Sequence, residues 1–175
     1  MARADTSRSG TMPVVDAFLA IASKRDVRAY AETPIPDDVA RRILDAGRLS
    51  GSSRNTQRWE FVVVESARER LADAVYAPDN VRKATLVVAI VGDAGGFDVG
   101  RCAQNMLLAA WNDGVASCPN GVRDPDAAAE ICGGEVKAIL SFGYPARPRD
   151  VAGRTADAWS ERADRKPLDE LVRRA

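Results

Sequence analysis

Short polar side chains run directly into a segment typical of a buried strand, because residues 50–64 read SGSSRNTQRWEFVVV. Hydroxyl and amide groups placed together can hydrogen-bond to a planar polar ligand or to a polyol, and small residues let the backbone approach it closely. The same composition is also typical of a polar loop in which serine and asparagine cap turns. The candidate binding residues here are Gly51, Ser52, Ser53, Asn55 and Gln57.

Two basic clusters offer groups that bind anions. Lys24, Arg25 and Arg28 lie close together near the N-terminus with Asp26 among them, and Arg165–Lys166 lie near the C-terminus. Arginine and lysine are the usual protein partners of phosphate. Cations at the end of a helix also complement the helix dipole and remain solvated. Neither cluster by itself decides between binding and solvation.

A third candidate segment follows the longest predicted helix, where residues 114–121 read GVASCPNG. Its backbone N–H groups can donate to a ligand. Asn120 and Gly121 are residue types that adopt positive φ in turns. We therefore expect Pro119, Asn120 and Gly121 to form a turn after a short strand.

The chain contains no histidine, which excludes histidine-based catalytic triads and the commonest zinc and non-haem iron sites. Chemistry must come from carboxylates, cysteines or a bound cofactor, and no metal site is predicted. Cys102, Cys118 and Cys132 form no CxxC pair, and their odd number indicates a reducing, cytoplasmic setting. We interpret all three as structural. Cys118 could instead sense oxidation, but the sequence shows no cation near it that would activate the thiol.

Charge and hydropathy exclude two classes of partner. Lysine plus arginine number 25 and aspartate plus glutamate number 25, so the net charge is zero and nothing favours nucleic acid or an anionic membrane. No apolar run approaches the roughly 20 residues that cross a bilayer. Residues 1–12 are polar and are expected to form a disordered tail, and residues 13–175 are expected to form a single domain.

The predicted elements alternate after an initial pair of helices, which indicates an α+β fold with helices covering a sheet. The first helix is expected to begin at Pro13 and to bury a wide apolar face that includes Phe18 and Ile21. A helix at 97–113 that is apolar on nearly all faces beyond its first turn is expected to be buried, so Gln104 and Asn105 within it need partners. The other helices are expected at 34–48, 67–75 and 125–132, strands at 59–65, 85–92, 115–118 and 136–144, and a terminal helix or arm at 167–173.

Taken in order, these pieces resemble the nitroreductase family of FMN-dependent oxidoreductases over roughly residues 14–175. The resemblance rests on five motifs: KRDVRAY followed by PIPDD, the segment SGSSRNTQRWEFVVV, the helix and loop DVGRCAQNMLLAAWNDGVASCP, the strand ILSFGYPA, and RKPLDELV.

The resemblance implies a three-layer sandwich whose mostly antiparallel sheet is covered by helices, in an intertwined homodimer with FMN at the interface. Lys24, Arg25 and Asp26 match the motif that holds the phosphate and ribityl chain, and Arg28 matches a cation near the flavin ring. Asp26 departs from the usual serine, and it is expected to pair with Arg25 or to accept from a ribityl hydroxyl. The remaining matches are Gly51, Ser52, Ser53, Asn55 and Gln57 in a loop from the second subunit, Pro119, Asn120 and Gly121 facing flavin N5 and O4, and Arg165 and Lys166 at the phosphate.

The implied activity is the reduction of electron-poor acceptors, such as nitroaromatics or quinones, by NAD(P)H in a ping-pong sequence. The flavin N5 carries the chemistry, so no catalytic side chain is implied. Two alternatives remain open: a deazaflavin-driven reductase of the same fold, and a non-catalytic flavin-binding protein. The sequence leaves undecided the physiological acceptor, the choice among NADH, NADPH and deazaflavin, and whether Asp26 and Arg58 weaken FMN binding.

Overall fold

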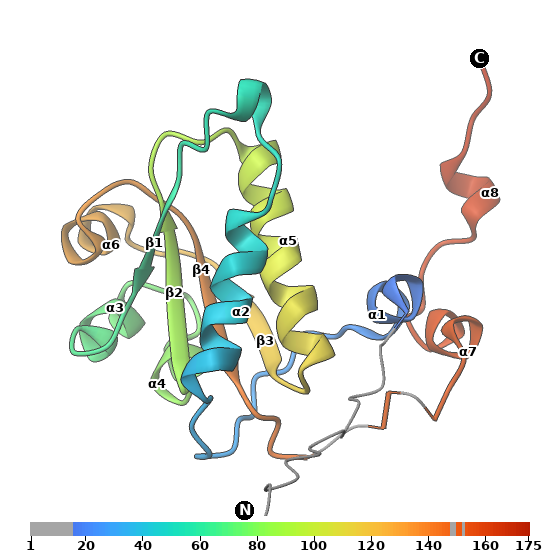
Figure 1. The fold of residues 1–175 in the computed structure, drawn as a ribbon, viewed down its shortest axis with the longest axis horizontal. Coiled ribbons are helices and arrows are strands. Elements are labelled where there is room, and N and C mark those ends of the chain that lie inside the picture. The colour runs from blue at the N-terminus through green and yellow to red at the C-terminus, as the bar shows by residue number, and fades with distance from the viewer. Residues whose placement is uncertain (1–15, 148–149, 152) are drawn as a thin grey trace, which may run out of the picture.

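A four-stranded antiparallel sheet forms the centre of the computed structural model, which describes residues 16–147, 150–151 and 153–175 (Figure 1). The strands lie in the order β1-β2-β4-β3. The register pairs Val63 with Val88 across the first ladder and Val88 with Leu140 across the second. This confirms the predicted α+β class and antiparallel sheet. The strand bounds are β1 Glu60–Val63, β2 Leu86–Val91, β3 Ala116–Asn120 and β4 Val136–Gly143.

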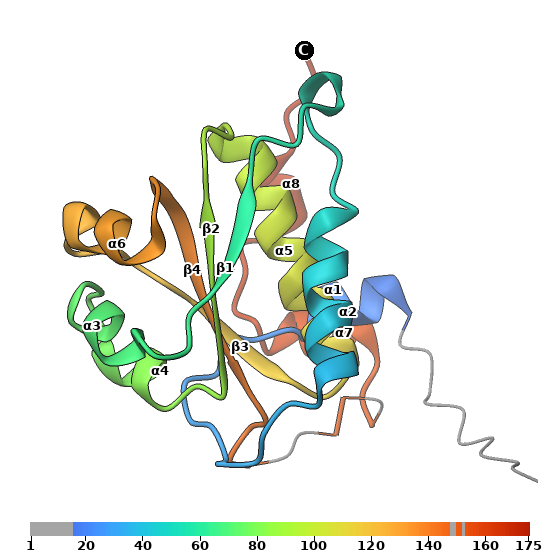
Figure 2. The ribbon, with the colours of Figure 1, turned by 60° about the vertical axis from the view of Figure 1, so that its left-hand side comes forward.

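Helices cover both faces of this sheet, so the molecule has three layers (Figures 1 and 2). Alternate side chains of β2 enter two different cores: Val88 belongs to the cluster with α2 and α5, and Val87 belongs to the cluster with α3 and α6. A strand buried on both faces is apolar at every position, as LVVAIV is. One face carries α2 Asp37–Arg48 and α5 Gly96–Asn112, and the other carries α3 Arg68–Asp73, α4 Pro78–Arg82 and α6 Pro125–Cys132.

Helices α2 and α5 pack closely because a glycine lies between them. A Cβ added at Gly47 would come 2.9 Å from Met106 and 2.9 Å from the ring of Phe61. Helix α2 itself follows from its sequence, with Asp37 and Asp38 in the first turn and Arg48 in the last, where each charge complements the helix dipole. The fully buried side chain of Met106 therefore fills the space between two helices and the sheet.

The two edges of the sheet differ. Along β3 the segment after α1 adds a main-chain bond from Val27 N to Ser117 O at 3.1 Å, and just past the end of β4 it adds one from Ala31 N to Tyr144 O at 2.8 Å. Within the described ranges, β1 pairs only with β2, which leaves its outer edge open. Pro119 lies inside β3, so the predicted end of this strand at residue 118 is wrong. Proline is tolerated in this place because β3 is an edge strand, where a missing N–H breaks fewer ladder bonds.

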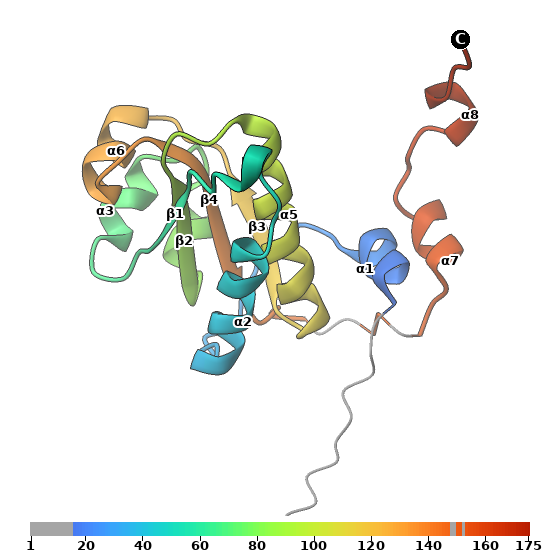
Figure 3. The ribbon, with the colours of Figure 1, turned by 45° about the horizontal axis from the view of Figure 1, so that its top comes forward.

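The N- and C-terminal elements lie beside the sandwich, not within it (Figure 3). Helix α1 Ala17–Ser23 begins after Asp16, whose carboxylate accepts bonds from Phe18 N and Leu19 N. The predicted helix start at Pro13 and the predicted tail at 1–12 lie outside the described residues. Phe18 is 66% exposed and Ile21 is 57% exposed, so the wide buried face predicted for this helix is wrong for the single chain. Helix α7 Ala156–Glu161 packs on α1, and α8 Leu168–Leu171 follows in an exposed C-terminal arm.

Helix α5 is buried on one side only, although its apolar sequence predicted burial all round. Gln104 is exposed, and Asn105 is also exposed while its amide donates to Ser50 Oγ at 2.8 Å. The side-chain amides of Gln104 and Asn105 therefore contact solvent or a hydrogen-bond partner and are not buried in a core. Across the described ranges, no helix is both long and apolar enough to cross a bilayer.

The packing around Met106 gives a stability prediction. Met106→Ala should lower the free energy of unfolding by about 2–5 kcal/mol, because it removes a fully buried side chain and leaves a cavity. Chemical denaturation followed by circular dichroism measures this. The control Glu130→Ala, which removes one exposed ion pair with Arg70, should change it by less than about 1 kcal/mol. Equal effects of the two variants would contradict the described packing.

Candidate flavin-binding site

The N-terminal basic segment lies against the edge of the sheet. Lys24 is the C-cap residue of helix α1. The chain then runs beside β3, where Asp26 forms an isolated β-bridge with Ser117. The Lys24 ammonium, largely buried, forms an ion pair with the Asp26 carboxylate. The described partner of Asp26 is therefore Lys24, where the sequence had suggested Arg25. This pairing places a cation and a compensating anion next to the backbone of β3.

Arg25 ties the basic segment to helix α7. Its guanidinium donates to Ala22 O at 2.7 Å and to Trp159 O at 2.8 Å, and it lies 5.7 Å from the centre of the Trp159 ring. Charged donors to main-chain carbonyls are stronger than neutral ones, and an arginine over an indole adds a cation–π contact. Nothing in the sequence signalled Trp159 as part of this region, because it lies in a stretch without clear period.

Arg28 is exposed and lies near the thiol of Cys118. Burial raises the pKa of the Cys118 thiol, while the charge of Arg28 acts in the opposite direction. The expectation that no cation lies near Cys118 is therefore wrong: the cation comes from a segment far away in sequence. Because burial dominates, the thiol stays protonated at neutral pH, and the structural interpretation of Cys118 is favoured.

The segment Pro119–Gly121 differs from the predicted turn. Neither Asn120 nor Gly121 has positive φ, because the strand continues through Asn120. The Asn120 side chain is turned into the sheet, where only 9% of the residue is exposed and its amide donates to Cys118 O at 3.1 Å and Ile139 O at 3.3 Å. Pro119 and Gly121 are exposed. The backbone of this segment, more than the Asn120 side chain, is thus available to a ligand.

The polar loop after α2 has a strained backbone. Arg54, Asn55 and Gln57 have φ values of 52°, 56° and 49°, which are uncommon for residues with a side chain. The loop is held by Ser53 N, which donates to Asp98 Oδ2 at 3.1 Å, and by Gln57 N, which donates to Ser52 Oγ at 2.9 Å. Strained, exposed polar loops occur preferentially at binding sites. Gly51 lies against Arg101, and a Cβ at this position would come 2.7 Å from its guanidinium.

The length of α5 separates the candidate residues. Trp111 Nε1 donates to Ser23 Oγ at 2.9 Å, which fixes the basic segment at the C-terminal end of α5. Asp98 holds the polar loop at the N-terminal end of the same helix (Figures 1 and 2). At 1.5 Å per residue, these two anchors lie about 20 Å apart along the helix axis.

One chain therefore brings together only part of the predicted site. Residues 24–28 and β3 lie side by side where Asp26 meets Ser117, and the loop at 51–57 lies at the other end of α5. Arg165 and Lys166 are exposed in the C-terminal arm (Figure 3). Sequence reasoning missed Tyr30 and Ser141, whose side chains meet beside Asn120 although they lie 111 positions apart.

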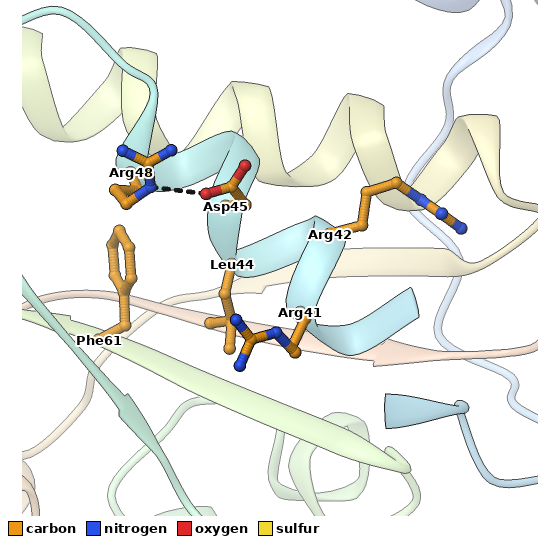
Figure 4. Close-up of a pocket in the computed structure, with 6 residues that line it drawn as sticks. All are labelled: Arg41, Arg42, Leu44, Asp45, Arg48 and Phe61. Carbon is orange, nitrogen blue, oxygen red and sulfur yellow. Dashed lines mark hydrogen bonds and ion pairs between the residues drawn. The ribbon is translucent and has the colours of Figure 1, made fainter. Parts of the chain in front are cut away.

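Two hollows on the surface of the described residues lie away from the basic segment. An open groove of about 570 Å³ lies between α2 and β1, where Arg48 pairs with Asp45 above Phe61 and Arg41 faces solvent (Figure 4). A smaller hollow of about 390 Å³ adjoins the polar loop and includes Ser53. Only the smaller hollow contains residues predicted from sequence.

Known proteins share both sequence and fold with this chain. The nitroreductase family model matches residues 21–94, which confirms the resemblance. An NADH dehydrogenase of Thermus thermophilus is 33% identical over 85 residues, which are 47% of this chain and 42% of that relative. A Methanothermobacter thermautotrophicus protein, whose name pairs NADH dehydrogenase with NAD(P)H nitroreductase, is 28% identical over 65% of this chain and 64% of its own length. This chain thus spans less than two thirds of either relative.

Solved structures extend the similarity in fold over most of the chain. A nitroreductase family protein of Streptococcus pneumoniae superposes with a TM-score of 0.76 at 15% identity, covering 89% of this chain and 98% of its own. A Desulfovibrio desulfuricans protein in complex with FMN gives 0.75 at 24% identity, covering 91% and 97%. The NADPH:FMN oxidoreductase of Vibrio harveyi complexed with NAD⁺ gives 0.75 at 22% identity, covering 89% and 75%. These likenesses establish the fold.

The buried thiols give a prediction about reactivity. Burial raises the pKa of Cys102 to about 11 and also raises the pKa values of Cys118 and Cys132. Because the thiolate is the reactive form, native protein at pH 8 should react with a thiol reagent far more slowly than the chain denatured in guanidinium, which should react at all three cysteines. A fast-reacting native thiol that Cys118→Ser removes would show that Arg28 activates Cys118.

Proposed function

We propose that this chain is an FMN-dependent oxidoreductase that uses NAD(P)H to reduce electron-poor acceptors. The chain has the nitroreductase fold and matches the nitroreductase family over residues 21–94. Nitroaromatics and quinones are the acceptor classes. The observation that carries the proposal is the basic segment 24–28, which packs against β3 at Ser117 and brings Arg28 near Cys118, one residue before Pro119. The names of relatives and an FMN complex of the same fold support it.

The residues present fit an anionic cofactor with many hydrogen-bonding groups. Lys24, Arg25 and Arg28 supply positive charge, and the polar loop supplies hydroxyl and amide groups. Arg25 is already engaged with three carbonyls, those of Ala22, Lys24 and Trp159, so its guanidinium is fixed in direction before a phosphate arrives. When bound, FMN would take a hydride from NAD(P)H and pass the electrons to the acceptor.

The side chains and backbone of this protein would bind the cofactor, orient it and stabilise the charge that develops on it. Lys24 and Arg25 would hold the phosphate, while Asp26 neutralises part of the Lys24 charge and limits the affinity. Arg28 would place a cation at the ring and so favour its reduced, negatively charged form. The backbone after Pro119, which itself has no N–H, would give donors to the ring edge, where charge develops during reduction.

The proposed site needs a second copy of the chain. The polar loop lies too far from the basic segment to share its ligand within one chain, since α5 separates the two by about 20 Å. Large apolar side chains are exposed on α1, α5 and the arm, and the outer edge of β1 is open. Homodimers cover such surfaces. The exposed large apolar residues on α1, on α5 and in the arm are Phe18, Ile21, Phe97, Leu168, Leu171 and Val172.

We place this enzyme in the cytoplasm. Its three cysteines are free and buried, which suits a reducing compartment. The proposed partners are a second copy of the chain, FMN, NAD(P)H and a small acceptor.

An absorption spectrum tests the function directly. Purified protein reconstituted with FMN should show flavin bands that bleach on anaerobic addition of NADPH or NADH and recover when a quinone is added. Bands that bleach with dithionite but not with either nicotinamide would indicate a deazaflavin donor or a non-catalytic flavin binder. Failure to retain FMN after reconstitution would contradict the proposal.

Mixed dimers test whether two chains share each site. Arg28→Ala alone should loosen FMN or lower the midpoint potential of the bound flavin, because a cation beside the ring is lost. The double variant Arg165→Ala/Lys166→Ala should weaken FMN binding through the phosphate. If these residues come from different chains, the mixed dimer has one intact site and one site that lacks all three cations.

Refolding the two impaired variants together should therefore restore part of the lost activity, whereas each variant refolded alone should keep its reduced activity. No recovery in a mixture shown by mass spectrometry to contain mixed dimers would contradict sharing across the interface.

A further inference from the structure

A buried group of side chains joins the two halves of the site that one chain supplies. The Asn120 amide donates to Ser141 Oγ at 3.1 Å, and the same Ser141 hydroxyl donates to Cys118 O at 3.1 Å. The Tyr30 phenol lies 3.0 Å from Ser141 Oγ and donates to Ser141 O at 3.2 Å. We call Tyr30, Ser141 and Asn120 the polar cluster. It links the segment that follows Arg28 to β3, which carries Pro119 and Asn120 and leads into Gly121.

The position of Tyr30 is fixed by packing as well as by hydrogen bonds. A Cβ added at Gly143 would come 2.8 Å from Tyr30 Cγ, so the ring lies directly on the backbone of β4. Main-chain bonds from Ala31 N to Tyr144 O and from Ala146 N to Ala29 O hold both sides of the residue. The phenol therefore reaches Ser141 with little freedom, and the Tyr30 hydroxyl acts as a rigid link between segments.

We propose that the polar cluster is the positioning device of the flavin site, with Tyr30 as a positioning residue that sets the placement of Arg28 relative to the backbone of Pro119–Gly121. The inference rests on the proposed function and deepens it. Tyr30 touches neither donor nor acceptor in this role. It acts through Ser141 and Asn120 on the backbone donors that face the flavin ring.

Two features show that the cluster does more than fill space. Asn120 Oδ1 is buried and has no hydrogen-bond partner among the described residues, and such an atom carries a desolvation cost that an apolar residue would avoid. Burial also raises the pKa of the Tyr30 phenol to about 12, so the hydroxyl remains a donor throughout the working range of pH. The buried Asn120 amide, which carries a desolvation cost, is therefore held in one orientation by Ser141. The Tyr30 phenol holds Ser141 in turn, and this phenol stays protonated.

A pair of matched variants separates positioning from stability. Tyr30→Phe removes only the hydroxyl that bonds to Ser141, and Thr85→Val removes a hydroxyl that donates to the neighbouring carbonyl, Phe142 O, at 3.4 Å. Tyr30→Phe should raise the dissociation constant of FMN by roughly two- to tenfold, the effect of one hydrogen bond, and should lower the midpoint potential. It should also move the amide resonance of Gly121 in the protein without FMN.

Thr85→Val should lower the melting temperature about as much as Tyr30→Phe does. It should leave the dissociation constant of FMN, the midpoint potential and the Gly121 amide resonance unchanged. Ser141→Ala should repeat the effects of Tyr30→Phe, and it serves if the tyrosine variant does not fold. Unchanged FMN affinity, potential and Gly121 resonance in folded Tyr30→Phe and Ser141→Ala would overturn the inference and leave the proposed function intact. A wild-type protein that does not bind FMN would overturn both.

Discussion

Helix α5 sets the distance over which the binding groups of this chain are spread. Its buried side is fixed against α2 and the sheet by Cys102 and Met106, so it cannot shorten or tilt without opening the core. Ser23 is bonded to Trp111 at one end of the helix, and the polar loop is bonded to Asp98 at the other. The arrangement of the candidate site follows from this rigid spacer, and the need for a second chain follows from it in turn.

The edge of β3 shows how the chain satisfies polar groups where a sheet ends. The segment after α1 supplies main-chain bonds to Ser117 and Tyr144, and Arg25 supplies side-chain bonds to carbonyls of α1 and α7. An open strand edge presents unpaired donors and acceptors. The basic segment that covers this edge therefore stabilises the fold whether or not a ligand is bound. The proposed phosphate-binding residues are therefore also structural, and their loss should affect both properties.

Much of the fold could be predicted because its signals are local. The all-apolar run of β2 and helix α6, bounded by Pro125 and by Gly133 at φ 73°, were predicted from neighbouring residues alone. Helices α4 and α7 were missed because they are too short to show a period. The apolar face of α1 was recognised, but its burial was wrong, because a pattern shows that a face is apolar and not what covers it.

The candidate site was less accessible to sequence reasoning for a related reason. Residue types indicated where binding groups lie, but the contact of Arg28 with Cys118 and that of Tyr30 with Ser141 join segments far apart in the chain. The inward turn of Asn120 depends on a strand that continues past a proline, which a local rule does not foresee. The grouping of the 51–57 residues with the basic segment stays a prediction.

The strained polar loop at 51–57 has a consequence for how such a protein can change over time. It belongs to neither core cluster, and it is held by the bond from Ser53 N to Asp98 and by bonds within the loop, such as that from Gln57 N to Ser52. Substitutions there alter the groups offered to a ligand while the buried layers keep their packing, because loops on a rigid scaffold tolerate exchange better than the elements that they join. The chain thus separates the part that can diversify from the part that must be inherited intact.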